Sequence, residues 1–324
     1  MAHAIRLHQT GGPEVLRWEE VEVPPPGPGE ATVQHAAVGL NFIDIYVRSG
    51  LYPSTLPGGL GQEAAGVVTA VGAGVNDVRV GDRVAYVGGP PGAYAEARNI
   101  AVTHLVPLPD EIPFTTAAAI LLRGLTAQYL LRQTYAVKPG DTILVHSAAG
   151  GVGLLLGQWG KALGATVIGT VGSEAKADLA RSHGCDHVIV TSRENFTERV
   201  RQITGGEGVP VVYDAVGADT FFGSLDCLRP LGLMVSYGNA SGPVPPISLL
   251  ELSKRGSLFI TRPTLFTYIR RREDLLAMAG ELFAMIGAGK LRIDVVRSHP
   301  LRDAGQAQED LAQRRTTGST VLIP

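Results

Sequence analysis

Residues 142–153 read TILVHSAAGGVG, and this stretch decides the fold. The apolar run at 142–146 breaks into a glycine-rich turn, which leads into a helix-like segment, LLLGQWGKA (154–162). A second apolar run, TVIGTV (166–171), follows. This order predicts a strand, a tight turn, a helix and a second strand parallel to the first. A small-x-Gly-x-x-Gly turn in that context holds the pyrophosphate of a dinucleotide against the amides at a helix N-terminus.

The alternative for this turn is purely structural, because glycines also let a helix pack closely on a sheet. The glycine pattern alone is a weak signal, but its place after a strand and before a helix favours a ligand. Three glycines in four positions, Gly150, Gly151 and Gly153, further indicate that the backbone must come close to something. We therefore predict a dinucleotide-binding turn.

The end of the second strand indicates which dinucleotide is bound. An acidic side chain there would bond the 2′-hydroxyl of the adenosine ribose, but Gly172 and Ser173 are not acidic and Lys176 follows shortly after them. Lysine after a strand often only begins a solvated helix. A phosphorylated ribose nevertheless fits Ser173 and Lys176 better than a free hydroxyl, so we predict NADPH.

Composition limits the class of protein. A chain of 324 residues exceeds the usual size of one hydrophobic core, so two domains are expected. It is 45% hydrophobic and 18% charged, with a net charge of -2, which provides no field to attract nucleic acid or an anionic membrane. Only two cysteines occur, as in a reducing compartment. No uninterrupted apolar run of about 18 residues and no cleavable leader are evident, so we expect a cytoplasmic protein outside the membrane.

The first third of the chain has short alternating runs separated by proline and glycine, which predict β-strands. These runs cover residues 4–8, 32–38, 64–71 and 83–86. A long apolar segment from residue 115 to residue 131 has helical composition, and we predict that it joins two domains.

Strands and helices alternate from about residue 138, which predicts a parallel sheet covered by helices. The strands are predicted at 143–145, 166–171, 188–190, 209–213, 232–236 and 258–261. After them we predict a helix at 273–286, an extended run at 293–296, a helix at 304–314 and a strand at 320–323. The expected fold is α/β: a doubly wound Rossmann domain, 125–264, inserted into a β-rich domain formed by 1–124 and 265–324.

Six segments carry a family resemblance: NFID (41–44), YVRSGLYP (46–53), GLGQEAAGVV (59–68), AAGGVG (148–153), SYGN (236–239) and GSTVLIP (318–324). Together they resemble the medium-chain dehydrogenases/reductases, and in particular the zinc-independent NADPH:quinone oxidoreductases related to ζ-crystallin. The resemblance runs through essentially the whole chain. It implies that the β-rich domain is a GroES-like catalytic domain and that the protein is a homodimer.

The resemblance also raises the question of a metal, because the superfamily contains zinc alcohol dehydrogenases. Those enzymes bind zinc through the histidine of a Gly-His-Glu segment and a cysteine of an earlier loop. Gln62 stands in the histidine position here, and the segment 41–44 contains no cysteine. An amide is a poor zinc ligand beside imidazole or thiolate, so we predict no metal site.

Quinone reduction suits a site of this kind. The product is a stabilised phenolate-like anion, and the protein supplies orientation, a flat apolar slot and hydrogen-bond donors. We predict Asn41, Tyr46 and Tyr52 as the donors that line the slot, with Asn41 resembling the family residue near the nicotinamide ribose. Core packing with a buried hydroxyl is the alternative for each tyrosine.

The resemblance implies cofactor contacts at the following positions. They are Asn41, Thr126, Tyr129, Gly150, Gly151, Val152, Gly172, Ser173, Lys176, Val216, Asn239, Leu265, Phe266 and Arg314. Gly151 and Val152 match the pyrophosphate turn, and Lys176 matches the 2′-phosphate pocket. Relatives carry a tyrosine near the adenine after the third strand, where this chain has Val190, Thr191 and Ser192.

Other candidates favour structural roles. His146, His183 and His187 are spaced unlike metal ligands, and each is expected at the surface or as a satisfied polar residue. Residues 270–272 are three arginines at a predicted helix start, where they face solvent.

Two alternative functions stay open. The first keeps NADPH but changes the acceptor to an α,β-unsaturated carbonyl, whose reduction needs the same donors. The second is a nucleotide-dependent binding protein of structural or RNA-associating type, which the lack of a basic stripe disfavours.

Overall fold

The computed structural model describes residues 1–313 and 315–324. The chain divides into two compact units. Unit 1 contains Met1–Arg123, Ile269–Phe283 and Ile293–Pro324, and unit 2 contains Gly124–Tyr268 and Ala284–Arg292.

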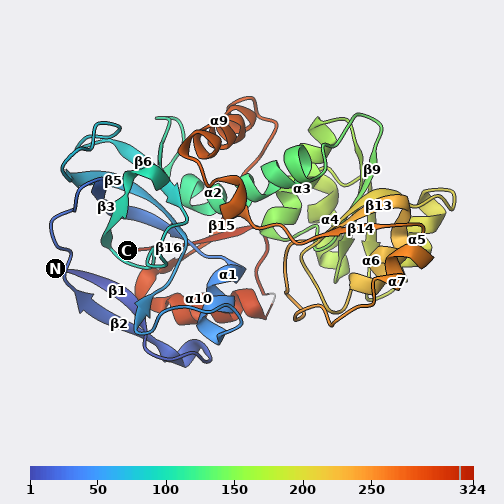
Figure 1. The fold of residues 1–324 in the computed structure, drawn as a ribbon, viewed down its shortest axis with the longest axis horizontal. Coiled ribbons are helices and arrows are strands. Elements are labelled where there is room, and N and C mark those ends of the chain that lie inside the picture. The colour runs from blue at the N-terminus through green and yellow to red at the C-terminus, as the bar shows by residue number, and fades with distance from the viewer. Residues whose placement is uncertain (314) are drawn as a thin grey trace. The chain divides into compact units, whose positions relative to one another are not determined.

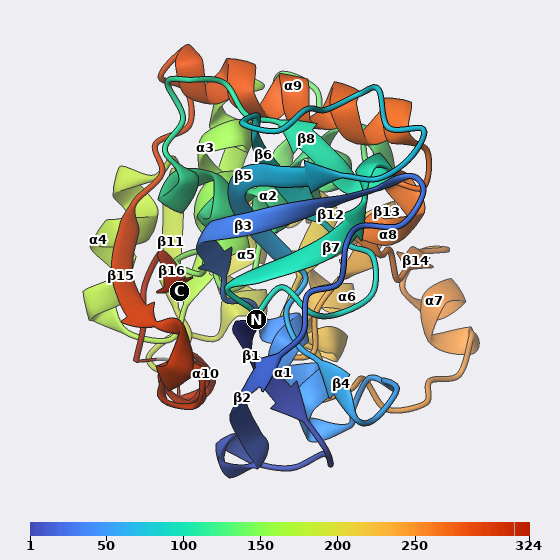
Figure 2. The ribbon, with the colours of Figure 1, turned by 90° about the vertical axis from the view of Figure 1, so that its left-hand side faces the viewer.

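Unit 1 is built on two mainly antiparallel sheets (Figure 1). Their strands are β1 (Ala2–Leu7), β2 (Leu16–Val21), β3 (Glu30–Gly39), β4 (Gly58–Gly59), β5 (Glu63–Val71), β6 (Arg83–Val87), β7 (Ala97–Ala101), β8 (Leu105–Pro107), β15 (Val295–Pro300) and β16 (Ser319–Ile323). The small sheet has the order β2-β1-β4, and the large one has the order β15-β16-β3-β5-β6-β8, with β7 also paired to β3. Figure 2 shows β3 between β5 and β7. The two C-terminal strands thus join the sheet of the first third of the chain.

The core of unit 1 forms where the alternating strands turn their apolar faces inward. Val33 of β3, Val68 of β5 and Leu105 of β8 are fully buried in one cluster, which Leu301 and Leu322 complete from the C-terminal segment. The helices of this unit are η1 (Pro13–Val15), α1 (Phe42–Ser49), η2 (Val102–His104), η4 (Leu301–Asp303) and α10 (Ala304–Ala312).

Two long helices cross the division between the units: α2 (Phe114–Tyr129), which a π turn, η3 (Leu130–Thr134), extends, and α9 (Arg272–Gly287). By length and composition, Phe114–Thr134 would suffice to cross a membrane. However, 78% of its most apolar 18-residue window is buried, as in the core helix of a globular protein.

Unit 2 contains one parallel sheet with the strand order β11-β10-β9-β12-β13-β14. Its strands are β9 (Thr142–Val145), β10 (Thr166–Val171), β11 (His187–Val190), β12 (Val209–Asp214), β13 (Leu228–Ser236) and β14 (Phe259–Thr261). Its helices are α3 (Gly151–Ala162), α4 (Glu174–Ser182), α5 (Phe196–Ile203), α6 (Phe221–Cys227), α7 (Leu250–Lys254) and α8 (Leu265–Tyr268). All six predicted strands are present, and the predicted fold class is confirmed.

The strand order reverses at β9, because β10 and β11 lie to one side of it and β12 to β14 to the other. Helices α3 and α4 pack against β9, β10 and β11, whereas α5 and α6 contact each other, with α6 packed on β12 and β13. Right-handed crossovers put the two helix pairs on opposite faces of the sheet. In open sheets of this type, ligands bind at the carboxyl ends of the strands near the reversal.

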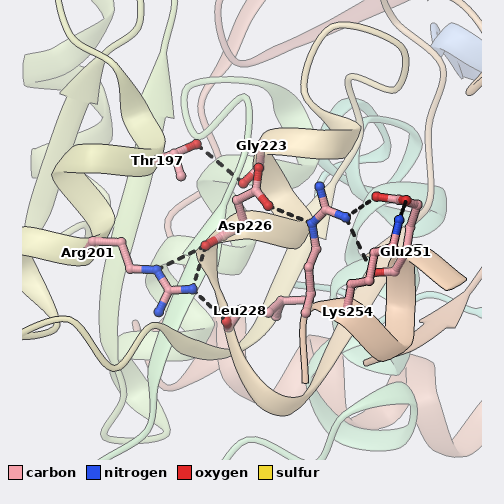
Figure 3. A network of polar contacts seen from close by, with 8 residues as sticks. Thr197, Arg201, Gly223, Asp226, Leu228, Glu251 and Lys254 are labelled. Atoms are coloured by element: carbon pink, nitrogen blue, oxygen red, sulfur yellow. Dashed lines mark hydrogen bonds and ion pairs between the residues drawn. The ribbon is translucent and has the colours of Figure 1, made fainter. Parts of the chain in front are cut away.

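A polar network braces the β13–β14 side of the sheet. Figure 3 shows the guanidinium of Arg201 donating to the carbonyls of Asp226, at 2.7 Å, and Leu228, at 3.0 Å. Arg255 bonds the Asp226 carboxylate at 2.6 Å and also pairs with Glu251 on α7. The Arg201 bonds link α5 to the junction of α6 and β13, and the bond from Arg255 links the end of α7 to α6.

Candidate functional site

The glycine-rich turn joins β9 to α3 and has the shape predicted for it. Gly150 is the N-cap of α3, and its extended backbone leaves the first turn of the helix with no side-chain cap and no acidic residue. A Cβ on Gly153 would lie 2.3 Å from the Ser147 carbonyl oxygen and 2.8 Å from the Ala148 Cα. Gly153 therefore lets the helix start directly against the turn, and the first amides of α3 suit an anionic group.

The end of β10 presents the residues expected to receive a 2′-phosphate. Gly172 is exposed, and a Cβ built on it would meet nothing within 4 Å. Ser173 is the N-cap of α4, and Lys176 lies in the first turn of that helix, with both side chains half-buried. The structure therefore brings Ser173 and Lys176 to the start of one helix, where the helix N-terminus favours a phosphate. The same first turn contains the acidic residue Glu174.

Two further predicted contacts lie just after the next strands of the sheet. Val216 follows β12, and its backbone N–H donates to the Asp214 carboxylate at 2.7 Å. Asn239 follows β13, with its amide placed between the Gly238 carbonyl oxygen, at 2.9 Å, and an Arg262 guanidinium nitrogen, at 3.2 Å. Both side chains are half-buried.

The predicted contacts on α2 and α8 are largely interior. Thr126 and Leu265 are buried, and Phe266 is half-buried. Tyr129 stacks on Tyr268 with ring centroids 4.3 Å apart, and burial raises the pKa of the Tyr129 hydroxyl. The contact predicted at Arg314 lies outside the described residues. Contact of these side chains with a cofactor stays a prediction.

Asn41 in unit 1 is held by a buried polar network. Its side-chain amide donates to the Glu63 carboxylate at 2.6 Å, and its amide oxygen accepts from Arg123 Nε at 3.0 Å. Arg123 also donates to Ser319 Oγ at 2.7 Å, and the second Glu63 oxygen accepts from the Leu122 N–H at 2.6 Å. The amide orientation of Asn41 is therefore fixed from both ends, with only one N–H beyond these contacts.

Two carboxyl groups of this network are fully buried. Burial raises the pKa of Glu63 to about 7, against the lowering effect of its bonds from Asn41 and Leu122. Burial likewise raises the pKa of Asp44 to about 7, although the Asn41 N–H and the Tyr94 hydroxyl both donate to it. Glu63 and Arg123 are site residues that the sequence does not predict, because neither a motif nor their spacing indicates their contact with Asn41.

Tyr46 and Tyr52 form an aromatic pair at α1. Their ring centroids are 5.2 Å apart at an interplanar angle of 60°, and the Tyr52 N–H donates to the Tyr46 carbonyl oxygen. Both side chains are half-buried. Asn41 is the N-cap of α1, Tyr46 lies on that helix and Tyr52 follows its C-terminal end, so one segment carries all three predicted acceptor-binding residues. Their role in catalysis stays a prediction.

Comparisons with known proteins agree over the full chain. Residues 27–110 match the family model described as alcohol dehydrogenase GroES-like domain, and residues 151–282 match the one described as zinc-binding dehydrogenase. Quinone oxidoreductase of Pseudomonas aeruginosa is 55% identical, with 100% of both chains covered. The solved structure of Escherichia coli quinone oxidoreductase complexed with NADPH is 50% identical, covers 100% of both chains and has a TM-score of 0.98.

This chain belongs to the quinone oxidoreductase family of medium-chain dehydrogenases/reductases. The predicted resemblance is thereby confirmed. Another relative is the 2-haloacrylate reductase of a Burkholderia species, 47% identical over 100% of this chain and 99% of its own.

The residues at the position of the zinc site of alcohol dehydrogenases do not suit a metal. Gln62 is buried, and the neighbouring Glu63 carboxylate already accepts two hydrogen bonds. Among residues 1–313 and 315–324, no group of three or more His, Cys, Asp or Glu side chains has an arrangement that could hold a metal ion. The Gln62 amide is a poor zinc ligand, and the carboxylate of Glu63 beside it is already engaged in hydrogen bonds, so the two do not make a zinc site.

Further polar residues of unit 2 have hydrogen-bond partners. Thr191 follows β11, and its N–H and hydroxyl both donate to the Val171 carbonyl oxygen. Arg262, which the sequence does not predict as a site residue, donates to the Ser236 carbonyl oxygen at 3.0 Å beside Asn239. His146 and His183 are buried with hydrogen-bond partners, and His187 is exposed at the start of β11.

Proposed function

We propose that this protein is an NADPH-dependent quinone oxidoreductase. One observation carries the proposal: the chain is 55% identical, end to end, to a quinone oxidoreductase. The E. coli relative of known structure was solved with NADPH bound, which supports the same cofactor here. When bound, NADPH supplies the hydride that reduces the quinone.

The residues of the chain supply binding and orientation. The first turn of α3, through Gly151 and Val152, is proposed to bind the pyrophosphate, and Ser173 with Lys176 the 2′-phosphate. Thr126, Tyr129, Val216, Asn239, Leu265 and Phe266 are the further contacts that we propose.

The acceptor residues are proposed from unit 1. Arg123 and Glu63 hold the Asn41 amide in one orientation, so that its remaining N–H is directed in advance. A preoriented donor stabilises the oxyanion of a reduced quinone without reorganisation. Tyr46 and Tyr52 offer ring faces for stacking against a planar acceptor. Because that oxyanion is delocalised and water protonates it readily, the reaction requires no Lewis acid.

We propose the functional division predicted from sequence, with the Rossmann domain at 125–264 and the GroES-like domain at 1–124 and 265–324. The compact units support it, although residues 124, 265–268 and 284–292 group with unit 2. A cytoplasmic location, without membrane or nucleic-acid partners, is proposed from the net charge of -2 and the burial of Phe114–Thr134.

A comparison of acceptors tests the function. NADPH oxidation is followed at 340 nm with 1,4-benzoquinone and, in parallel, with 2-chloroacrylate and a simple enal. We expect kcat/KM to be higher for the quinone by about 10-fold or more, corresponding to roughly 1.4 kcal/mol in the transition state. Faster turnover of chloroacrylate or the enal would favour the unsaturated-carbonyl alternative, which the higher identity to quinone oxidoreductases disfavours. NADPH binding without oxidation by any acceptor would favour a binding protein.

Lys176→Ala tests the cofactor assignment. Loss of a charge partner of the 2′-phosphate is expected to raise the KM for NADPH about 10-fold while the KM for NADH changes by less than about 2-fold. Lys161→Ala is the matched control, because Lys161 is an exposed lysine of the same unit that pairs with Asp186. Equal effects of Lys176→Ala on both cofactors would remove the 2′-phosphate role.

We also propose a homodimer formed through β14. This strand ends the six-stranded sheet, and the large exposed apolar side chains Leu231, Leu249, Leu250 and Phe259 lie on β13, on β14 and at the start of α7. An apolar terminal strand suits pairing with a second copy about a twofold axis.

A further inference from the structure

A hydrogen-bonded chain of four buried polar side chains runs through unit 2, and none of the four is among the proposed contacts with the cofactor or the acceptor. His146 Nδ1 lies 2.9 Å from Thr170 Oγ1, and His146 Nε2 lies 2.9 Å from Ser224 Oγ. Ser224 Oγ in turn donates to Asp214 Oδ2 at 3.0 Å. All four side chains are at most 3% exposed.

Which group donates and which accepts in each of these hydrogen bonds follows from the bonds that Asp214 accepts. Asp214 accepts four bonds, from the hydroxyls of Thr220 and Ser224 and from the N–H groups of Val216 and Gly217. The only proton of Ser224 Oγ is thereby used, so His146 Nε2 must carry a hydrogen and donate it to Ser224. Burial lowers the pKa of His146, which favours the neutral ring. Its Nδ1 then accepts from the Thr170 hydroxyl.

This hydrogen-bonded chain of side chains connects three loops at the edge of the sheet where ligands bind. His146 directly follows β9 and precedes the glycine-rich turn. Thr170 is the penultimate residue of β10, two positions before Gly172. Asp214 ends β12, and its carboxylate closes the loop that contains Val216. Backbone bonds add to this link, because the Ala148 N–H donates to the Thr170 carbonyl oxygen and the His146 N–H to that of Tyr213.

The order of the groups excludes a hydrolytic role. In a catalytic triad the carboxylate orients the histidine and the histidine activates an accessible serine. Here the carboxylate bonds the serine, and Ser224 is fully buried on α6. A connection between loops therefore accounts for the arrangement better than chemistry at Ser224.

We propose that His146 is a positioning residue for the dinucleotide, which sets the spacing of the loops after β9, β10 and β12 through Thr170, Ser224 and Asp214. This inference rests on the proposed function, since it assigns the loops to NADPH. The histidine suits this role because one rigid ring bonds acceptor and donor groups on two sides, so that the strand ends cannot shift independently.

Direct titration of NADPH into the full-length protein tests the proposal, with binding followed by calorimetry. His146→Leu introduces an apolar side chain of similar size and removes both hydrogen bonds of the ring. We expect the Kd for NADPH to rise about 10-fold, the effect of about one lost hydrogen bond transmitted to the loops. The kcat at saturating NADPH and the KM for quinone are expected to stay within about 2-fold, because no group in contact with the acceptor changes.

Milder variants cover the case in which His146→Leu does not fold. Thr170→Val keeps a β-branched side chain in β10 and removes only its hydroxyl, and Ser224→Ala removes only the other partner. Each is expected to raise the Kd about 3-fold. His146→Gln, whose amide can still donate toward Ser224, is expected to restore part of the affinity that His146→Leu loses.

The control is His35→Leu. His35 is also a buried histidine with two bonds, to the Ala95 carbonyl oxygen and the Tyr86 hydroxyl, but it belongs to unit 1. Its loss is expected to lower the Tm without changing the Kd for NADPH. The proposal fails if His146→Leu, Thr170→Val and Ser224→Ala, like this control, lower the Tm and leave the Kd for NADPH unchanged. The four hydrogen-bonded side chains would then only stabilise the fold.

Two further readouts separate the possible failures. Nitrogen-15 NMR of the unaltered protein should show a neutral His146 protonated at Nε2, and protonation at Nδ1 would overturn the derived directions. Failure of the unaltered protein to bind NADPH would instead refute the proposed function, whatever the variants do.

Discussion

At the scale of single residues, the environment of Asn41 changes how its role is understood. The sequence predicts a hydrogen-bond donor at this position, and the structure shows an amide already bonded on both sides by Glu63 and Arg123. Glu63 is 22 positions away in the sequence and Arg123 is 82 positions away. No periodicity or motif connects residues at such separations, so the sequence predicts the donor but not the groups that orient it.

The first prediction at this scale concerns pH. Burial raises the pKa of Glu63 from its ordinary value of 4.5 to about 7 in the folded protein. The folded state therefore holds a proton that the unfolded chain releases over this range. The stability contributed by Glu63 is complete below about pH 4.5 and is lost as the pH rises through about 7. At roughly 1.4 kcal/mol for each pKa unit, the loss is about 3 kcal/mol.

Glu63→Gln measures this contribution, because glutamine does not titrate. Urea unfolding between pH 4.5 and 8 should find the variant less stable than the unaltered protein at low pH, with the difference shrinking as the pH rises. Glu111→Gln, at an exposed carboxylate, controls for the exchange itself. A difference between the Glu63→Gln variant and the unaltered protein that stays constant with pH would mean that Glu63 ionises normally in the fold.

At the scale of elements, the sequence predicts the strands that contain continuous apolar runs and misses strands that are polar or very short. The six strands of the parallel sheet contain such runs, and β9, β10 and β12 have no exposed residue, so all six were predicted. In contrast, β2 (Leu16–Val21) has the sequence LRWEEV with no buried residue, and β8 (Leu105–Pro107) contains only three residues. Helix α1 was also missed, although Asn41 and Gly50 mark its two ends.

The glycines of the cofactor loops provide the prediction at this scale. Gly153→Ala would place a Cβ 2.3 Å from the Ser147 carbonyl oxygen, so α3 must move away from the turn. We expect a loss of stability of about 2 kcal/mol or more and weaker NADPH binding. Gly172→Ala meets nothing within 4 Å, so its Tm should stay close to that of the unaltered protein.

The two alanine variants thus separate packing from binding. Thermal unfolding without ligand should distinguish Gly153→Ala from Gly172→Ala, whereas NADPH titration should find both weakened if a cofactor lies against Gly172. Gly280→Ala, in an exposed and open position on α9, controls for the general effect of the exchange and should stabilise by up to about 1 kcal/mol. Normal NADPH affinity in Gly172→Ala would place the cofactor away from that loop.

At the scale of the whole molecule, the family resemblance predicted more than local patterns did. Motifs spread from residue 41 to residue 324 identified the family, which the full-length comparisons confirm. The same motifs say little about which residues cooperate inside a unit. Thr170, His146, Ser224 and Asp214 belong to β10, the end of β9, α6 and β12, and only the folded sheet brings them together.

The last prediction concerns assembly. Among residues 1–313 and 315–324, three terminal strands carry a large exposed apolar residue: Trp18 on β2, Phe259 on β14 and Val296 on β15. Leu231 on β13 and Leu249 and Leu250 at the start of α7 are exposed as well, and exposed apolar surface favours association. Phe259→Lys would place a charge on the paired strand of each copy, so light scattering after gel filtration should find a monomer where the unaltered protein is a dimer.

Val296→Lys is the matched control, because it introduces the same charge on a terminal strand of another sheet and should leave the dimer intact. Comparing the oligomeric states of the two variants tests two strand edges of one molecule with the same change of charge. A monomeric Val296→Lys with a dimeric Phe259→Lys would assign the interface to β15. A monomeric unaltered protein would show that the apolar surface beside β14 is not sufficient for association, and that Phe259, Leu249 and Leu250 remain in solvent.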